Sequence, residues 1–212
     1  SDTYVDYVTI AGSLSGSVGG STGRFGGLVG ESHDSYLWQA VSTMGLTVTG
    51  SALSDEMATR AGGLIGDMIG GYIERSSYSG AITVNVNTRN DFYVPPSAAG
   101  GLAGSIDDGT IYDSHANVAL SVTGTGTWDI GGIAGSNGGS IYDTYVTGTV
   151  TATMPGAYDV NVYPLGERFA LATYYNKAET CDPVPNDGGW AYDILPAVPV
   201  STRLAEVTRT RE

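Results

Sequence analysis

Apolar and polar residues alternate over short stretches of this chain, and the alternating stretches recur along its length. Alternation with a period of two predicts a β-strand with one buried face. Many Thr, Val, Tyr and Gly residues favour short strands joined by tight turns over helices. We therefore expect an all-β protein. The clearest alternating stretches are Leu46–Thr49, Ile82–Val86, Leu120–Thr123 and Val150–Thr153.

Each alternating stretch follows a Gly-Gly-apolar-x-Gly string. These strings begin at residues 26, 62, 100 and 131, so their spacings are 36, 38 and 31 residues. A repeat of about this length supplies roughly three short strands and cannot bury both faces alone, so neighbouring repeats must stack. We predict a β-solenoid of four to five coils, with terminal strands that act as caps or as donors to another subunit. The repeat glycines are Gly26, Gly27, Gly30, Gly62, Gly63, Gly66, Gly100, Gly101, Gly104, Gly131, Gly132 and Gly135.

The repeat glycines are expected at the corners of the coil, where the backbone needs a positive φ or a close approach to its neighbour. An apolar residue recurs 10 or 11 positions after the first glycine and should point into the stack. These apolar residues are Leu37, Ile73, Ile111 and Ile141.

An aromatic column is expected one position further on, at Trp38, Tyr112 and Tyr142, with Glu74 in the remaining repeat. Such a column has two interpretations, an aromatic ladder that caps the stacked strands or a stripe that binds sugars. His115 is expected in the same strand position as Tyr78 and Tyr145, as a surface ladder residue.

The chain is expected to have three parts. Residues 1–25 hold an N-terminal strand and a Gly/Ser-rich segment, residues 26–175 hold the solenoid, and residues 176–212 hold a C-terminal cap or strand. The Gly/Ser content of residues 12–23 predicts flexibility. A degraded fifth repeat is expected from Leu165.

The terminal strands either cap their own solenoid or pair with the edge of another subunit. Head-to-tail pairing between subunits would build a filament if the rotation that relates neighbouring subunits does not close into a ring. The residues expected at such a contact are Tyr4, Val8, Ile10, Val198, Val200, Leu204 and Arg209.

Charge narrows the choice of partners. The chain of 212 residues has 22 acidic and 9 basic residues, for a net charge of −13, while the last twelve residues carry a charge of +1. Nine basic residues are too few to form a basic groove. Nucleic acid is therefore not expected as a partner. No apolar run is long enough for a transmembrane helix, and no membrane insertion is expected.

Candidate catalytic chemistry is sparse. The chain has two histidines, His33 and His115, and one cysteine, Cys181, which lies between acidic residues that disfavour a reactive thiolate. Asp113 and Asp143 occupy equivalent repeat positions and would form a glycosidase-like pair, although duplication alone explains the match. No enzymatic activity and no cofactor are expected.

Calcium is the one metal that the acidic residues suggest, at Asp107, Asp108 and Asp91. Solvated surface acids are the simpler interpretation of the same residues.

The Gly-Gly-Leu-x-Gly strings, each followed by a Tyr- or Ser-containing strand and a Thr/Val strand, resemble the GLUG-motif repeats over about residues 24–155. The Gly188-Gly189-Trp190 stretch is similar to the Trp-containing end that follows such repeats. The resemblance implies a β-helix-like stack from a microbial cell-surface protein, such as an adhesin or a secreted peptidase. In that family the repeats are structural or accessory modules, so no catalytic residue is implied.

The sequence thus favours an extracellular structural protein, the acidic subunit of a self-assembling surface filament, sheath or appendage, with copies of itself as partners. A monomeric adhesin or carbohydrate-binding module of a larger surface protein is the alternative, with a carbohydrate or a host surface as partner.

Overall fold

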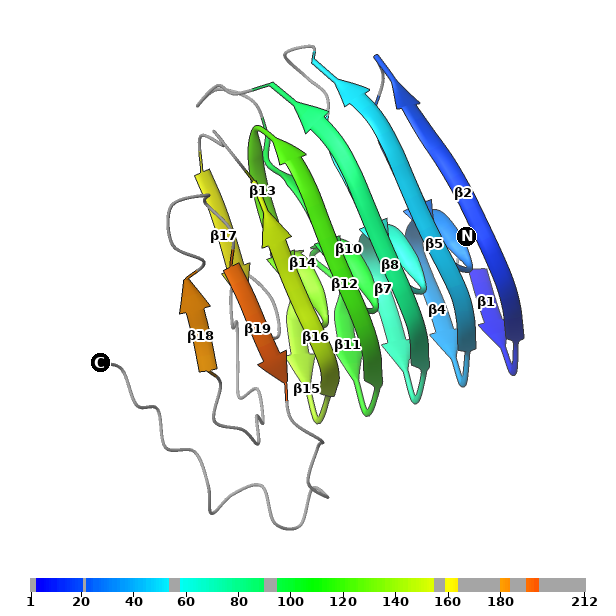
Figure 1. Ribbon diagram of the computed structural model, residues 1–212. Helices are drawn as coiled ribbons and strands as arrows, with labels where there is room; N and C mark the ends of the chain where they lie inside the picture. Colours follow the sequence, from blue (N-terminus) through cyan, green and yellow to red (C-terminus); the bar gives the residue numbers. More distant parts are fainter. Residues whose placement is uncertain are drawn as a thin grey trace.

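The computed structural model describes residues 3–20, 22–53, 58–89, 95–154, 159–163, 180–183 and 190–194. Within these residues the fold is a β-solenoid without helices, built from three sheets that we name A, B and C. This confirms the predicted fold class. Sheet B forms the near layer in Figure 1, and the strands of sheet A lie behind it. The described part of the chain contains no helix that could span a membrane.

The strands of each sheet come from successive coils. Sheet A contains β1 (Thr3–Asp6), β4 (Val29–Trp38), β7 (Ile65–Glu74), β10 (Ala103–Asp107), β11 (Thr110–Tyr112), β14 (Ala134–Asn137) and β15 (Ser140–Tyr142). Sheet B contains β2 (Thr9–Gly19), β5 (Val41–Ala52), β8 (Ser77–Thr88), β12 (His115–Thr125), β16 (Tyr145–Thr153), β18 (Thr180–Pro183) and β19 (Trp190–Ile194). Sheet C contains β3 (Gly23–Gly26), β6 (Thr59–Gly62), β9 (Ser97–Gly100), β13 (Thr127–Gly131) and β17 (Asp159–Tyr163).

A complete coil passes through sheet C, then sheet A, then sheet B, as in β3–β4–β5. Equivalent strands of successive coils pair in parallel, so residues at the same repeat position become neighbours along the stack. The recurring apolar residues illustrate the register, since Leu37 pairs with Ile73, Ile73 with Ile111, and Ile111 with Ile141. All four are at most 4% exposed, as the sequence predicts.

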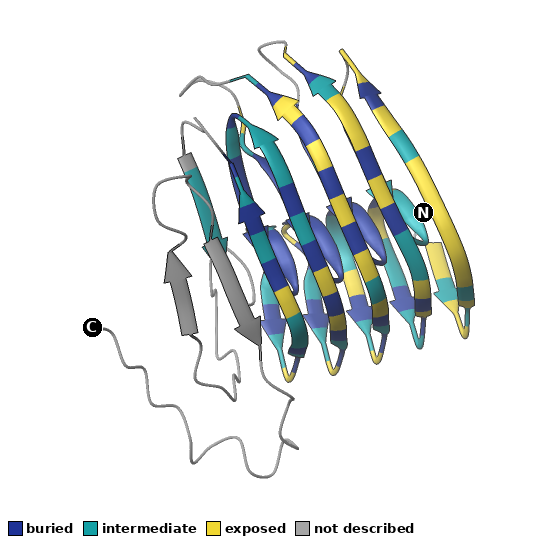
Figure 2. Ribbon diagram, viewed as in Figure 1, coloured by how far each residue is buried: buried dark blue, intermediate teal, exposed yellow. Residues whose placement is uncertain are grey.

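The core is a column of apolar side chains inside the coils. Alternate residues of sheet B point inward, and Leu46, Ile82, Leu120 and Val150 lie in one register and are at most 1% exposed. Figure 2 shows the resulting alternation of buried and exposed residues along the strands of sheet B. Burial of this column against neighbouring coils is the main force that holds the stack together.

The repeat glycines form the corner between sheets C and A. None of the twelve has a positive φ, so close backbone approach is the reason for glycine here. At Gly63, a Cβ atom would lie 2.2 Å from the carbonyl oxygen of Gly101 in the next coil. At Gly104, a Cβ atom would lie 2.5 Å from the backbone nitrogen of Ala61 in the previous coil. Any side chain would therefore push neighbouring coils apart.

The N-terminal segment belongs to the solenoid. β1 pairs with β4, and β2 pairs with β5 over eleven residues, so they form a first, partial coil. The predicted flexibility of residues 12–23 is therefore wrong for Gly12–Gly19, which lies within β2. At the other end of sheet B, β19 pairs antiparallel with β16, and β18 with β19. The degraded fifth repeat from Leu165 lies outside the described residues.

Candidate functional site

The corner between sheets A and B uses a left-handed backbone conformation in every described coil. The residues at this corner have φ angles of 43° to 53°. Asp113 and Asp143 suit the conformation, since Asp tolerates it better than most residues. The Arg75 side chain forms an ion pair with Asp113 at 3.2 Å across neighbouring coils. The corner residues are Tyr7, Gln39, Arg75, Asp113 and Asp143.

A buried row of hydroxyl groups follows this corner. The Ser76 hydroxyl accepts a hydrogen bond from the backbone nitrogen of Ala40 at 3.1 Å and donates one to the carbonyl of Glu74 at 2.8 Å. Ser114 repeats both bonds one coil further on, and the Thr144 hydroxyl donates to the carbonyl of Tyr142 at 2.6 Å. The hydroxyl row therefore links adjacent coils at a turn where ladder bonds are interrupted.

A continuous aromatic column runs along the outside of sheet A. Tyr4 stacks on Tyr36 with ring centroids 4.8 Å apart, and Tyr36 stacks on Tyr72 at 5.0 Å. Because the rings are nearly parallel, with interplanar angles of 11° and 20°, each covers the face of its neighbour. The column stabilises the stack. This column was not predicted from the sequence, although a tyrosine one position before the recurring apolar residue in two coils was a usable signal.

The predicted aromatic positions share one register, since Trp38 pairs with Glu74, Glu74 with Tyr112, and Tyr112 with Tyr142. Glu74 separates Trp38 from the two tyrosines, so the rings do not form an unbroken column. A hydrogen bond to Glu74 raises the pKa of Tyr112 to about 12, with burial adding to the effect. Tyr7 meets the Trp38 ring edge-on at 4.8 Å.

His115 stacks on Tyr145 with ring centroids 5.0 Å apart, and burial lowers its pKa. The predicted equivalence with Tyr78 is wrong, because His115 pairs with Ser77 and Ala116 pairs with Tyr78. A shift of one residue turns a strand side chain to the opposite face. Tyr78 is accordingly buried inside the coil, where its hydroxyl donates to the carbonyl of Met44 at 2.8 Å.

Charged side chains from sheets C and A meet at the glycine corner. The guanidinium of Arg24 lies 2.8 Å from the carboxylate of Asp67 and 3.2 Å from that of Glu31. The hydrogen bond to Asp67 raises the pKa of Arg24. In the next coil, Arg60 donates to the carbonyl of Pro96, and burial lowers its pKa against the opposing influence of Asp67. None of these contacts was anticipated from the sequence.

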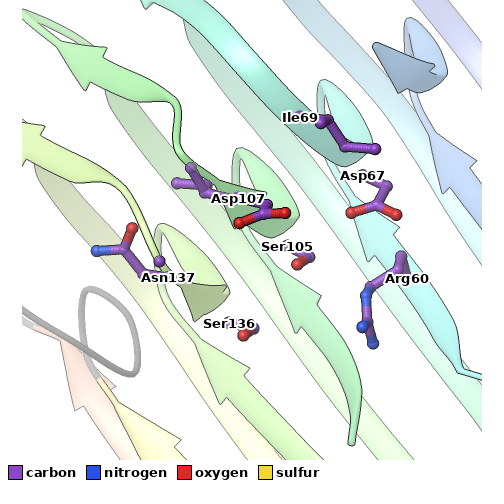
Figure 3. A pocket seen from close by; sticks show the side chains of 9 residues that line it. Arg60, Asp67, Ile69, Ser105, Asp107, Ser136 and Asn137 are labelled. Atoms are coloured by element: carbon purple, nitrogen blue, oxygen red, sulfur yellow. The ribbon is translucent and has the colours of Figure 1, made fainter. Parts of the chain in front are cut away.

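A polar hollow of ≈ 380 Å³ adjoins this charged cluster (Figure 3). Figure 3 shows Arg60 and Asp67 at one end of the hollow and the hydroxyls of Ser105 and Ser136 along it. Asp107 is exposed at its rim. The hollow thus offers carboxylate, guanidinium and hydroxyl groups to a polar ligand.

The N-terminal end of the stack is open in the described part of the chain. β1 pairs with only Ser35–Trp38 of β4, and β2 is the outermost strand of sheet B. Apolar side chains are exposed there, with Tyr4 63%, Tyr7 66% and Leu14 38% exposed. A hollow of ≈ 420 Å³ lies beside β1 and is lined by Val5, Val29, His33, Tyr36, Leu37 and their neighbours.

The predicted subunit contacts divide between the ends of the chain. Tyr4 lies in β1, Ile10 lies in β2, and Val8 packs against the core between the two strands. The predicted C-terminal contacts, Val198, Val200, Leu204 and Arg209, lie outside the described residues.

The candidate chemical groups are dispersed. His33 lies in sheet A, 2.7 Å from Glu31, whereas His115 lies in sheet B. Cys181 is in β18. The described residues include no group of three or more His, Cys, Asp or Glu side chains that could hold a metal ion. Of the predicted calcium ligands, Asp91 lies outside the described residues.

Comparison with protein families matches residues 126–151 to the family model described as the GLUG motif. No curated protein and no solved structure matches the chain. The matched segment corresponds to almost one complete coil, because it contains β13, the glycine corner at Gly131 and Gly132, β14, β15 and most of β16. The matched motif thus covers the path C–A–B of one coil.

Proposed function

We propose that this GLUG-motif protein is an extracellular structural protein whose copies join end to end by strand pairing into a surface filament, sheath or appendage. The GLUG motif and the β-solenoid fit a surface or adhesin-like repeat protein. The open N-terminal end of the stack is the observation that supports self-association. The function is structural rather than catalytic.

The two ends of sheet B differ. β2 exposes one side of an eleven-residue strand at the N-terminal end, whereas at the other end β19 covers β16 and the four-residue β18 is the outermost strand. A long open edge is a template for pairing with another chain. Because the two ends are unlike, end-to-end pairing would be heterologous, which produces an open filament when the rotation does not close.

The segment of residues 198–212 is the proposed donor. Its Val198, Val200, Thr202 and Leu204 occupy alternate positions, as on one face of a strand. Three arginines (Arg203, Arg209 and Arg211) against two glutamates give the last twelve residues a charge of +1. The preceding residues carry a charge of −14. Charge complementarity therefore favours pairing between this segment and the acidic body of another copy.

Electron microscopy of the full chain over a range of concentrations tests the proposal. We expect ordered fibres from the unmodified protein and none after deletion of residues 198–212. Leu14→Lys should also prevent fibres, because it places a charge on the exposed apolar end of the stack. Leu53→Lys is the matched control, since Leu53 is 59% exposed but follows β5, one coil inside the terminal strand. Monomeric protein at every concentration, or fibres that survive both end variants, would reject the proposal.

A monomeric carbohydrate-binding module remains the second candidate, and the polar hollow beside Arg60 favours it. Sugar hydroxyls pair with groups of the kind that line this hollow, such as Asp107, Ser105 and Ser136. A glycan array tests this function. Binding should be lost in Asp107→Ala and kept in Asp143→Ala, whose carboxylate lies at the A–B corner. Absence of glycan binding by the unmodified protein would eliminate the candidate.

A further inference from the structure

The outer face of sheet B carries no charged side chain in its five parallel strands. β2, β5, β8, β12 and β16 contain no Asp, Glu, Lys or Arg, although the protein has a net charge of −13. The face is open along these strands, as the exposed positions in Figure 2 show. A large uncharged surface on a highly charged protein indicates a partner that is itself uncharged.

Hydroxyl-bearing residues dominate this face and lie in register. Two adjacent rows cross all five strands at its centre. The first row is Ser15, Thr47, Thr83, Ser121 and Thr151. The second row is Ser17, Thr49, Asn85, Thr123 and Thr153.

The array is regular in two directions and rigid. Parallel strands repeat about every 4.8 Å, and alternate residues on one strand repeat about every 6.6 Å. Threonine has a restricted χ1 angle, so its methyl and hydroxyl groups hold fixed positions. Each strand is also anchored by inward neighbours, for example Ile82 and Val84, which flank Thr83 and are 0% exposed.

The geometry points to ice as the occupant. We propose that the outer face of sheet B is an ice-binding surface, on which the rows of hydroxyl and methyl groups hold water in an ice-like arrangement that joins the crystal. The strand spacing lies close to an oxygen–oxygen repeat in hexagonal ice, so each row can follow the lattice along the stack. The absence of charge favours this occupant because ionic groups orient water around themselves and disrupt a lattice. This surface is separate from the open end of the stack and does not depend on self-association.

Other occupants fit the face less well. Nucleic acid requires cations that the five strands lack. Crystalline polysaccharides bind best to exposed aromatic rings, and the rings on this face are confined to His115 and Tyr145 at the start of two strands. A second copy of the protein would place the same face against itself and gain few apolar contacts.

Ice-crystal shaping and thermal hysteresis of the full chain test the proposal. Thr83→Tyr should lower the activity about tenfold or more, because a large ring at the centre of the array holds the face away from the crystal. Thr110→Tyr is the matched control, because Thr110 pairs with Tyr72 on the outside of sheet A and accommodates the same side chain there. We expect its activity to equal that of the unmodified protein. Thr49→Lys, which adds charge without an aromatic ring, should also lower activity.

The proposal is overturned if the unmodified protein does not shape ice, or if Thr83→Tyr and Thr110→Tyr have equal activity while circular dichroism shows both to be folded. Sedimentation with crystalline cellulose and chitin provides another decisive outcome. Binding that Thr83→Tyr abolishes, without ice shaping by the unmodified protein, would assign the face to a polysaccharide. A dimer that Thr83→Tyr dissociates would assign it to a second copy.

Discussion

The buried hydroxyl of Ser114 accepts a hydrogen bond from the backbone nitrogen of Ser76 at 3.1 Å, and the two serines occupy the same position in neighbouring coils. The hydroxyl also donates to the carbonyl of Tyr112 at 2.8 Å in its own coil. One side chain therefore satisfies the Ser76 N–H, which lies between two backbone hydrogen bonds of the corner, Arg75 N to Tyr112 O and His115 N to Ser76 O. Both serines are 1% exposed, so water cannot replace either bond.

Ser114→Ala should lower the free energy of unfolding by about 1–3 kcal/mol, because it leaves the buried N–H of Ser76 without its partner. Urea unfolding monitored by circular dichroism measures the change. Ser114→Thr should cost less, since Thr144 fills the equivalent position in the next coil and makes the same bond to its own strand. Ser79→Ala on the exposed face of β8 is the control and should be nearly neutral. Equal losses in Ser114→Ala and Ser79→Ala would contradict the linking function of the hydroxyl row.

Gly63→Ala should destabilise the fold by roughly 3 kcal/mol or more, at the upper end for single substitutions. The added Cβ would lie 2.2 Å from the carbonyl oxygen of Gly101 and 2.3 Å from the ring of Tyr78, so adjacent coils must separate. Gly19→Ala is the matched control, because a Cβ at Gly19 meets no atom within 4 Å. Thermal unfolding of both variants distinguishes them. A Gly63→Ala protein as stable as Gly19→Ala would show that the corner tolerates side chains.

The stacking of coils was predictable from the sequence because one short string carries its cause. In each Gly-Gly-apolar-x-Gly string the glycines permit close approach and the apolar residue enters the core, as Leu64 and Leu102 do at 0% exposure. Both requirements recur in every coil, so the period survives the variation in loop length. The strand positions and the inward-facing residues of sheet B followed from the same period.

Contacts between coils were harder to predict, because repeats of 36, 38 and 31 residues do not align by simple counting. His115 follows the recurring apolar residue Ile111 by four positions, whereas Tyr78 follows Ile73 by five, and this difference reverses the face. The ion pair between Arg24 and Asp67 joins residues 43 positions apart through two sheets. Such a pair has no local signature in a single sequence.

The Gly/Ser-rich stretch of β2 shows a different reason for error. Composition predicts flexibility when a segment has few apolar side chains to bury. In β2, however, eleven residues pair with β5, and the side chains on the outer side of the strand are exposed to solvent. Gly16 lies where a Cβ would be 2.3 Å from the ring of Phe25, so glycine here makes room for a core residue. Pairing and packing thus order a segment whose composition alone does not.

Thr110→Tyr should raise the free energy of unfolding by about 0.5–1 kcal/mol, because it extends the stacked column of Tyr4, Tyr36 and Tyr72 by one ring. Thr110 pairs with Tyr72 in the adjacent strand, which sets the spacing that the existing rings use. Urea unfolding measures the gain. Thr83→Tyr adds the same side chain to sheet B between Thr47 and Ser121, where no ring is available, and should change stability little. No gain in Thr110→Tyr, or an equal gain in both variants, would show that ring stacking is not the cause.

Tyr78 should make the stability of the fold decrease between about pH 10 and pH 12. Burial raises its pKa from 10.0 to about 12, so the folded protein holds the phenolic proton more tightly than the unfolded chain does. The sign follows from linkage: the stabilisation is fully present below pH 10 and is lost as pH rises toward the folded-state pKa. The hydroxyl donates to the carbonyls of Met44 at 2.8 Å and Ala81 at 3.1 Å, and an ionised oxygen can donate to neither.

Urea unfolding of the unmodified protein and of Tyr78→Phe over a series of pH values isolates this contribution. Tyr78→Phe removes both hydrogen bonds and should be less stable at neutral pH. The difference between the two proteins should stay constant up to about pH 10 and then shrink, because only the unmodified protein has this proton to lose. Tyr112→Phe is the informative comparison, since the pKa of Tyr112 is raised mainly by Glu74 at the surface, where solvent weakens the coupling to folding. A difference between the unmodified protein and Tyr78→Phe that stays constant through pH 12 would mean that the Tyr78 phenol ionises equally in the folded and unfolded states.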